Sequence, residues 1–265
     1  MKLLILGCGP SGLIAAHAAY NRGVDFVVVS KARKSFMNGA QYLHAPIPGV
    51  SLADPFLINY EISGSVAGYR DKVYGPDAKV EVSPETLVGR HLAWDIREAY
   101  DALWGLYGAD VHDVDITPTI LSKLIKDWKP DAVISTVPAT VLCYNSRDHR
   151  FGHELVWSTN ELECSLSDNT VLCNGEPGFD WYRASKIQGF TNTEWPHNKY
   201  PLAYNGQIWR VVKPLQTNCR CFPDVHRMGR YGKWTKGVLS HEAWEEANKI
   251  MDGVQTGVSL DTTGA

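Results

Sequence analysis

Residues 2–30 read KLLILGCGPSGLIAAHAAYNRGVDFVVVS, and this stretch decides the fold of the chain. Residues 3–6 form an apolar run of the length of a buried parallel strand, and residues 26–29 form a second one after a helical segment. Three glycines with G-x-G-x-x-G spacing lie between the first run and the helix: Gly7, Gly9 and Gly12. The stretch predicts a βαβ unit with a dinucleotide fingerprint at its first turn.

Each position of the fingerprint has a physical role. Gly7 permits the tight turn, Gly9 lets the backbone approach a pyrophosphate, and Gly12 lets helix and strand pack closely. Pro10 and Ser11 begin the helix, whose N-terminus offers free N–H groups and the positive end of its dipole to phosphates. The alternative is a βαβ unit that binds nothing and has these glycines by chance.

The residue that usually binds the ribose is acidic and follows the glycines by about 20 residues. Ser30 stands at this place, with Lys31, Arg33 and Lys34 directly after it. A serine can still hydrogen-bond a ribose hydroxyl, whereas the basic residues could hold a 2′-phosphate and would then indicate NADP. A solvated basic loop is the third interpretation, so this unit alone does not decide the dinucleotide.

Composition excludes several classes of protein. The chain has 265 residues with 44% hydrophobic and 21% charged residues, and its net charge is −3. It can bury a substantial core, and the charge gives no general attraction to nucleic acid or membrane. No apolar run approaches the roughly 20 residues of a membrane span, and the N-terminus leads straight into a strand. We expect a cytoplasmic protein of undetermined oligomeric state.

The six cysteines are scattered and form no CxxC pair. Cys219-x-Cys221 alone is a weak metal signal, so we expect reduced thiols and no metal site.

Periodicity predicts the remaining elements. Amphipathic helices are expected from Asp95 to the stop at Gly108, from the N-cap Thr117 to Trp128, and from about Ser240. Strands are expected at 56–62, around Val73, and at 80–82, 131–136, 153–157, 162–166, 170–173, 181–188 and 207–214. Residues 35–50 and 191–206 read as loops, and the first of these leaves the sheet edge where ligands bind.

Three separated segments resemble one family. GCGPSGL at 7–13, DAVISTVPA at 131–139 and GRYGKWTKGVLSHEAWEEA at 229–247 are similar to the FAD-binding elements of glutathione-reductase-type flavoproteins. The nearest branch contains the UDP-galactopyranose mutases and flavin amine oxidases, and WYRASKIQGFTNTEW at 181–195 is similar to an active-site strand of the mutases. The chain is short for this branch, which suggests a minimal, phage-type member.

The resemblance implies FAD as the cofactor and assigns roles to individual residues. The pyrophosphate would be held by Gly7, Gly9, Pro10, Ser11 and Gly12, and the ribose by Ser30 and Lys31. The isoalloxazine would be approached by Gln41 and Tyr42, and the cofactor would be lined at the end of a strand by Thr136, Val137 and Pro138. The flavin would be covered by Gly229, Arg230, Lys233 and Trp234. Arg230 could pair with a phosphate or stabilise anionic reduced flavin, or it could make a surface salt bridge.

Three residues are the candidates for catalysis. His44 could act as an acid or base, or could be a structural histidine packed under its loop. Arg183 could anchor an anionic substrate or make a cross-strand ion pair, and Tyr182 with Trp181 could stack on a substrate or only pack.

The fold class expected is α/β, with a Rossmann-like FAD-binding domain and a smaller β-rich substrate-binding layer. The FAD-binding domain takes residues 1–50, 110–145 and 205–252, the layer takes 51–109 and 146–204, and a flexible tail takes 253–265. The function expected is oxidation of a small polar substrate, an amine or a modified nucleoside or nucleotide, by hydride transfer to the flavin. Nucleic acid would be a partner only if it carried the modified base.

Two other functions stay open. One is a non-redox flavin enzyme of the sugar-nucleotide mutase type. The other is an NADP-binding reductase or sensor module, which Ser30 and the basic residues after it would favour.

Overall fold

The computed structural model of the chain describes residues 1–31, 41–202 and 206–256. The basic residues Arg33 and Lys34 lie outside this part. The chain divides into two compact units. Unit 1 consists of Met1–Leu52, Ile96–His153 and Pro214–Ala265, and unit 2 of Ala53–Asp95 and Glu154–Lys213.

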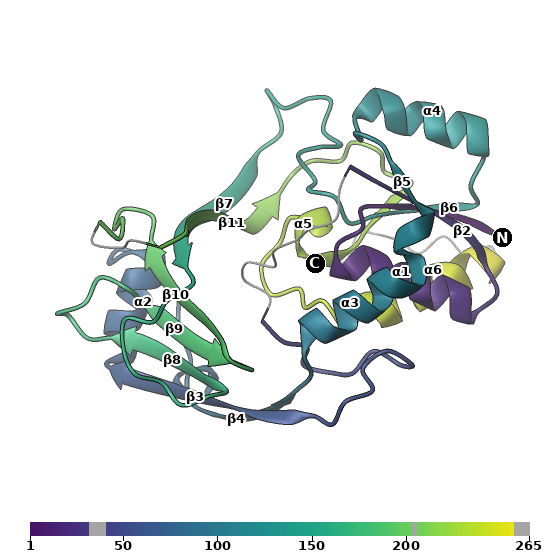
Figure 1. Cartoon of the computed structure of the whole chain (residues 1–265). Coiled ribbons are helices and arrows are strands. Elements are labelled where there is room, and N and C mark those ends of the chain that lie inside the picture. Colours follow the sequence, from purple (N-terminus) through teal and green to yellow (C-terminus); the bar gives the residue numbers. More distant parts are fainter. Residues whose placement is uncertain (32–40, 203–205, 257–265) are drawn as a thin grey trace. The chain divides into compact units, whose positions relative to one another are not determined.

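Unit 1 is built on a parallel sheet (Figure 1). Among the described residues the sheet has five strands in the order β12-β6-β1-β2-β5. Their bounds are β1 (Lys2–Leu6), β2 (Asp25–Ser30), β5 (Val111–Asp113), β6 (Ala132–Ser135) and β12 (Val225–Arg227). β1 pairs with β2 on one side and β6 on the other, so that Leu3 lies opposite both Phe26 and Ala132. The predicted βαβ unit is confirmed.

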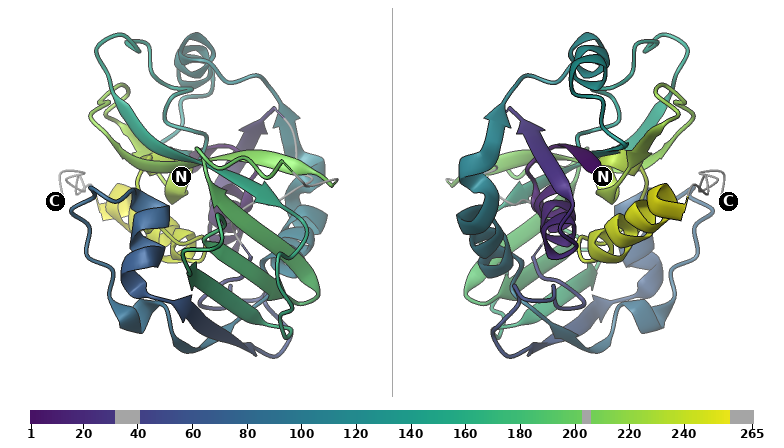
Figure 2. Two further views of the ribbon diagram at one scale, coloured as in Figure 1. Left: turned by 90° about the vertical axis from the view of Figure 1, so that its left-hand side faces the viewer. Right: turned by 90° about the vertical axis from the view of Figure 1, so that its right-hand side faces the viewer.

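Helices cover both faces of this sheet. They are α1 (Pro10–Asn21), α3 (Ile96–Tyr107), α4 (Pro118–Trp128), the short α5 (Gly229–Lys233) and α6 (Glu242–Thr256), with a 3-10 turn, η2 (Gly108–Asp110), after α3. Leu4 and Leu6 pack in one cluster with Leu121 of α4. Successive side chains of a strand point to opposite faces, so Leu3 and Ile5 face the other side, where α1 contacts β1 and also packs against α3 and α6 (Figure 2).

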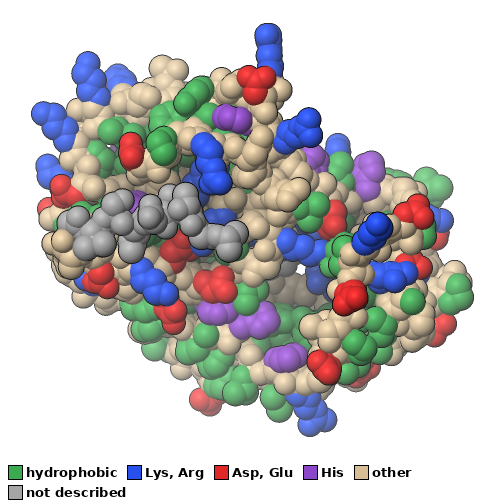
Figure 3. Space-filling model, turned by 180° about the vertical axis from the view of Figure 1, so that it is seen from behind, with side chains coloured by type: hydrophobic (Ala, Val, Ile, Leu, Met, Phe, Trp, Pro, Cys, Tyr) green, Lys and Arg blue, Asp and Glu red, His purple; other side chains and the backbone are tan. Residues whose placement is uncertain are grey.

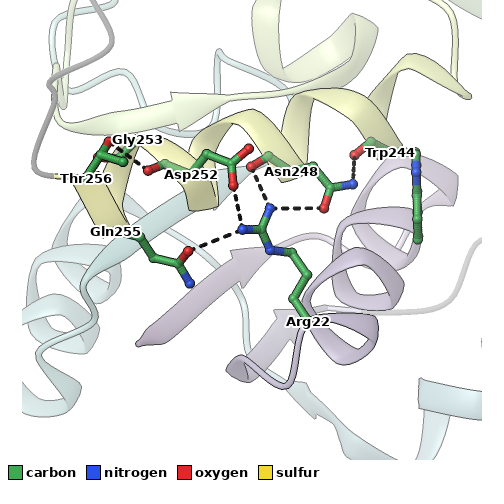
Figure 4. A network of polar contacts seen from close by, with 7 residues as sticks. All are labelled: Arg22, Trp244, Asn248, Asp252, Gly253, Gln255 and Thr256. Carbon is green, nitrogen blue, oxygen red and sulfur yellow. Dashed lines mark hydrogen bonds and ion pairs between the residues drawn. The ribbon is translucent and has the colours of Figure 1, made fainter.

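A polar network joins the βαβ unit to the last helix (Figure 4). Arg22, the C-cap of α1, donates hydrogen bonds to Asn248 O and to the side chains of Asp252 and Gln255. Asn248 in turn donates to Trp244 O at 2.9 Å. The first and the last helix of the described chain are thereby fixed to each other.

Unit 2 is built on a mixed sheet. In the described chain this sheet has seven strands in the order β11-β7-β10-β9-β8-β3-β4. Their bounds are β3 (Phe56–Gly64), β4 (Gly89–Ala93), β7 (Phe151–Thr159), β8 (Thr170–Gly175), β9 (Arg183–Ile187), β10 (Phe190–Pro196) and β11 (Ile208–Thr217). β3 and β8 are parallel, and β8, β9, β10 and β7 pair antiparallel in turn. Two of the four boundaries between the units fall inside β7 and β11.

The predicted divisions of the chain differ from the structure at α3, at both ends of the second segment of unit 2, and at the tail. α3 was expected in the layer at 51–109 but belongs to unit 1, because its apolar face packs on α1 and the Tyr100 hydroxyl donates to Cys8 O at 2.8 Å. Unit 2 resumes at Glu154 and ends at Lys213, where residues 146 and 204 were expected. The tail was expected from residue 253, but α6 continues to Thr256, and residues 257–265 lie outside the described part.

Local predictions were wrong where short segments lack a strong period. The strand expected around Val73 is α2 (Val66–Tyr74), a helix capped by the Ser65 side chain, which accepts from Gly68 N at 3.0 Å. Residues 80–82 and 162–166 form no strand, and a 3-10 turn, η1 (Pro84–Thr86), follows the first of them. β10 lies where a loop was expected, because the Asn192 side chain donates to Ser158 Oγ and Thr159 O of the neighbouring β7.

No helix in the described ranges combines the length and apolar character that a membrane crossing requires. Acidic and basic side chains both occur over the face of the molecule in Figure 3, in keeping with the small net charge.

Candidate functional site

The order of strands in unit 1 predicts where a ligand would bind along the edge of the sheet. From β1 the chain moves to β2 and β5 on one side, and it returns through α4 to β6 and β12 on the other. In open parallel sheets, ligands bind at the carboxyl ends of the strands where the order reverses, which here means β1 and β6. Gly7 follows β1 and Thr136 follows β6, so the predicted cofactor residues lie at this point.

The three glycines of the fingerprint are required for different reasons. Gly7 has a φ of +100°, and an added Cβ would lie 2.5 Å from Thr136 Oγ1. At Gly12 the Cβ would lie 1.9 Å from Gly7 O, because helix and turn touch there. At Gly9 an added Cβ meets nothing within 4 Å. Gly7 and Gly12 therefore serve the fold itself, whereas the space beside Gly9 is open.

The first turn of α1 faces this open space with its N-terminal end. Gly9 is the N-cap and makes no side-chain cap, and Pro10 occupies the first turn. The first N–H groups of a helix without a side-chain cap are available to an anion, and the helix dipole favours negative charge at that end. Gly9 and the turn that follows form a cradle of the kind that phosphates occupy.

The segment after β6 is tied to the end of β1. Thr136 N and Thr136 Oγ1 both donate to Leu6 O, at 2.8 and 3.0 Å. Val137 lies against Gly7, because a Cβ added at Gly7 would be 3.2 Å from Val137 Cγ1. Pro138, the next residue, is exposed. The structure thus brings the predicted residues Thr136, Val137 and Pro138 next to the fingerprint.

The Gly-Arg segment reaches the same place from the far end of the chain. Gly229 has a φ of +69°, and an added Cβ would lie 2.7 Å from Ser11 Oγ. Met228 N donates to Ser135 O at 2.8 Å, and Ala139 N donates to Tyr231 O at 2.9 Å. α5 is therefore packed between the first turn of α1 and the end of β6.

The two last residues predicted in this segment already have protein partners. Lys233 makes an ion pair of 2.9 Å with Glu246 of α6. Trp234 is buried, and its indole N–H donates to Gly152 O at 2.9 Å. Both side chains brace α5, and their expected contact with the cofactor stays a prediction.

Arg230 differs from both. Its Nε is buried, and no hydrogen-bond partner for this atom is found among the described residues. Buried polar atoms in native proteins are nearly always paired, so an orphaned donor beside a phosphate-type cradle fits an anionic ligand. Burial raises the pKa of the neighbouring Tyr231, and the positive charge of Arg230 opposes this rise. The salt bridge considered as the alternative for Arg230 is not found in the described chain.

The end of β2, which we call the ribose edge because ribose binding is expected there, contains an acidic residue that the sequence did not point to. Ser30 is buried at the end of β2, and its partner across the parallel pair is Asp113 of β5. Lys31 makes an exposed ion pair of 2.9 Å with Asp115, and the hydrogen bond and charge of Asp115 raise the pKa of Lys31. A three-residue strand gives no periodic signal, so Asp113 was missed.

The loop that carries Gln41, Tyr42 and His44 lies near the start of α6. The rings of Tyr42 and His44 are 4.8 Å apart, and those of His44 and His241 are 5.9 Å apart. His44 is exposed, while Nδ1 of His241 is buried with no hydrogen-bond partner among the described residues. The pairing of two histidines was not foreseen, because 197 positions separate them in sequence (241 − 44).

The base of this loop is held by a buried histidine. His17 of α1 contacts Tyr107 Oη through Nδ1 at 2.7 Å and Pro48 O through Nε2 at 2.8 Å. Burial raises the pKa of Tyr107 to about 12. The contacts tie the loop at Pro48 to α1, and through His17 to Tyr107 of α3.

The other two catalytic candidates lie in unit 2, inside a network of buried charges. Glu194 of β10 is 1% exposed and lies opposite Arg183 of β9. Its Oε2 accepts from Arg183 Nη2 at 2.8 Å, from Lys213 Nζ at 2.9 Å and from Tyr182 Oη at 2.9 Å. Arg183 thus makes the cross-strand ion pair considered as its alternative role, and Tyr182 with Trp181 is packed in the interior of unit 2.

The network controls the charge of Glu194. Burial by itself raises the pKa of the carboxyl, but the positive charges of Arg183 and Lys213 lower it to about 2. Burial by itself lowers the pKa of Arg183, but Glu194 and the neighbouring tyrosines together have the larger effect and raise it. These contacts give a structural account of Tyr182 and Arg183, and a catalytic role for either stays a prediction.

No protein-family model matches the chain, and no curated protein matches its sequence. Solved structures are similar in fold. The 2,6-dihydroxypyridine-3-hydroxylase of Arthrobacter nicotinovorans has a TM-score of 0.54 at 10% identity, over 98% of this chain and 84% of that one. A geranylgeranyl bacteriochlorophyll reductase-like protein of Thermoplasma acidophilum has a TM-score of 0.56 at 12% identity, over 97% and 79%.

The flavin-dependent brominase Bmp2 has a TM-score of 0.56 at 11% identity, over 96% of this chain and 80% of that one. At these identities the likeness concerns the fold, and it adds no support for the narrower resemblance to mutases and amine oxidases. The predicted fold class is confirmed: the chain is an α/β protein with a Rossmann-like parallel sheet covered by helices and a second, mixed sheet.

Proposed function

We propose that the chain is an FAD-dependent oxidoreductase acting on a small-molecule substrate. The observation that supports this most is the cradle at the carboxyl ends of β1 and β6. It combines the open space beside Gly9, the close approach of Gly229 to Ser11, and the orphaned donor of Arg230. The name of one similar structure, a flavin-dependent brominase, agrees with a flavin at this place.

The cofactor supplies the redox chemistry, since a flavin accepts and returns a hydride, and the residues of the chain bind and orient it. The backbone at Gly9 and the N-terminus of α1 would hold the pyrophosphate. Arg230 Nε would donate to an anionic group, either a phosphate oxygen or the reduced ring, where a positive charge stabilises the negative form.

The ribose edge favours FAD over NADP. Asp113 lies beside Ser30 in the register of the sheet, and Lys31 is already paired with Asp115. Carboxylates accept hydrogen bonds from free ribose hydroxyls, whereas they repel a 2′-phosphate, and the repulsion increases as water is excluded. Lys31 therefore no longer supports the alternative of an NADP-binding module, because its charge is paired with Asp115.

For the substrate we keep a small polar molecule, an amine or a modified nucleoside or nucleotide, that gives up a hydride. His44 and His241 are the candidates to take the proton, because an imidazole ring nitrogen can act as a general base. A second candidate reaction is hydroxylation, which the name of the Arthrobacter enzyme suggests. Consumption of NADH or NADPH with oxygen would accompany the second reaction and not the first.

The experiment is a matched pair of glycine variants. Gly9 has a φ of −71°, so Gly9→Val should fold normally and yet place its side chain where the pyrophosphate lies. Gly178→Val in unit 2 makes the same change at another glycine with open space. We expect FAD in the wild type and in Gly178→Val, measured by absorbance and mass spectrometry of the released cofactor.

Gly9→Val should contain no FAD and keep the circular dichroism spectrum of the wild type. Full FAD content in Gly9→Val, or no flavin in reconstituted wild type, would show that the cradle does not bind this cofactor.

A further inference from the structure

Unit 1 contains a cluster of thiols and one imidazole at a distance from the fingerprint in sequence. Cys143, His149, Cys219 and Cys221 each offer one ligand atom, and these atoms all lie within 4.8 Å of one another. The cysteines were expected to be scattered reduced thiols with no metal. That expectation considered only the pair Cys219 and Cys221. The fold places a second pair of possible ligands, Cys143 and His149, beside them.

We propose that these four side chains bind one zinc ion. Cys143 Sγ lies 3.3 Å from His149 Nδ1, and Cys221 Sγ lies 3.5 Å from the same nitrogen. With Zn–S near 2.3 Å and Zn–N near 2.0 Å in a tetrahedron, sulfur and nitrogen are roughly 3.6 Å apart and two sulfurs roughly 3.8 Å. The two sulfur–nitrogen distances therefore already agree with the spacing that a zinc ion imposes, and the limit of 4.8 Å on all pairs leaves only a small contraction for the rest.

The kind of donor selects the metal. Three thiols and one imidazole form a soft set that suits zinc, whereas magnesium and calcium take oxygen ligands. The set supplies four protein ligands, which closes a tetrahedral site and is typical of structural rather than catalytic zinc. Cys219 and Cys221 are 4% and 2% exposed, and Cys143 and His149 are half-buried, so the protein would cover the ion mainly on the side of Cys219 and Cys221.

Arg227, the last residue of β12, supports the cluster from outside. Its Nη2 donates to Cys219 Sγ at 3.4 Å and to Cys221 O at 3.0 Å. Three thiolates around a divalent cation leave one net negative charge, which the guanidinium offsets. Hydrogen bonds of this kind orient metal ligands and raise affinity.

The two segments that bring the ligands are also fixed to each other. Arg150 N donates to Asn218 Oδ1 at 2.7 Å, and Thr217 Oγ1 donates to Arg150 O at 2.9 Å. Cys219 N donates to Thr217 Oγ1 at 3.1 Å. The ligands are therefore held in position by the protein, and little ordering would accompany binding of the ion.

The site has a structural use that does not depend on the proposed cofactor. β12 is an edge strand of three residues, and Gly229 follows it after one residue. Such a short edge strand has few backbone hydrogen bonds of its own. A zinc ion bound by Cys219 and Cys221 would anchor the approach to this strand to the segment after β6.

The first test is metal content. The wild-type chain, purified without chelator and without a metal resin, should contain one zinc per chain by plasma mass spectrometry. Cys219→Ser should lose it, whereas Cys164→Ser, which removes a cysteine of unit 2 outside the cluster, should keep it. Arg227→Gln should weaken zinc binding about 10- to 100-fold.

The second test uses the wild type alone, in case Cys219→Ser does not fold. X-ray absorption at the zinc edge should give three sulfur atoms at about 2.3 Å and one nitrogen at about 2.0–2.1 Å. The proposal is wrong if metal-stripped wild type fails to take up one equivalent of zinc against a chromogenic chelator. Iron in place of zinc, a zinc shell without sulfur, or a disulfide among these cysteines in the purified chain would each overturn it as well.

Discussion

Arg183 in unit 2 and Arg230 in unit 1 are both partly buried arginines, and their surroundings are opposite. Arg183 lies opposite Glu194 across two strands and contacts its carboxylate at 2.8 Å, in a network that Lys213 and Tyr182 complete. Arg230 has a buried Nε with no hydrogen-bond partner among the described residues, beside a helix N-terminus and an open space. A buried charge that stabilises the fold has a partner of opposite charge within the protein, as Arg183 has. A buried donor without a partner, at the point where the strand order reverses, indicates a ligand instead.

The largest effect is expected at Glu194, the negative partner of Arg183. Glu194→Gln leaves Arg183 and Lys213 without their negative partner inside unit 2, and this should lower the free energy of unfolding by about 3–5 kcal/mol. Denaturant titration followed by circular dichroism measures it. Glu163→Gln, an exposed position of the same unit, should change stability by no more than about 0.5 kcal/mol. An equal effect of both variants would mean that the network does not stabilise unit 2.

We expect the stability that Glu194 contributes to depend on pH. The pKa of this carboxyl is lowered from 4.5 to about 2 on folding. The stability that Glu194 contributes is therefore fully present above pH 4.5 and is lost as pH falls toward 2, and it amounts to roughly 3 kcal/mol. Unfolding of wild type and Glu194→Gln at a series of pH values should show the two converging over this window. A constant difference between them down to pH 2 would contradict the assignment.

Arg230 should respond in the opposite way. Because the Nε has no hydrogen-bond partner in the part of the chain that the structure describes, Arg230→Gln should change the free energy of unfolding of the apoprotein by less than about 0.5 kcal/mol. FAD affinity should fall by about 1.5–3 kcal/mol, the contribution of a hydrogen bond to a charged group, which is roughly 10- to 150-fold. Titration of the deflavinated chain with FAD measures this, with Arg210→Gln at an exposed site as the control. Loss of stability without loss of FAD affinity would make Arg230 structural, like Arg183.

Asp113 should give the smallest effect. Asp113→Asn removes the carboxylate beside Ser30 and should weaken FAD by about 1 kcal/mol, or roughly fivefold, because one hydrogen bond to a ribose hydroxyl is weakened. NADP, which the carboxylate repels, should bind the variant better than the wild type. Unchanged affinity for both would remove Asp113 from the ribose edge.

The sequence predicted the parts of this fold whose signals are local. The βαβ unit follows from its apolar runs and glycines, and α4 begins with Thr117 as N-cap and Pro118 after it, as the residue types indicate. Gly7 and Gly12 have the steric roles expected of them, and Gly9 has the open space that its role requires.

What the sequence could not show depends on contacts between distant residues. β5 and β12 have three residues each, too few for a period, and they bring Asp113 and Arg227 to the sites discussed. Glu194 lies in a segment that reads as a loop, and its three donors come from other strands or turns. The proposed zinc ligands come from two separate segments, Cys143 with His149 and Cys219 with Cys221. Neither pair alone has the spacing of a known zinc motif, and only the fold brings the two together.

The most direct test of the account titrates the deflavinated wild-type chain with FAD, FMN and NADP in parallel. FMN shares the flavin ring but has no pyrophosphate-linked adenosine, and NADP carries the 2′-phosphate. We expect one FAD site per chain and no measurable binding of NADP. FMN should bind much more weakly than FAD, because it leaves the Gly9 cradle and the ribose edge unused. Tight binding of NADP with none of FAD would contradict the proposed function.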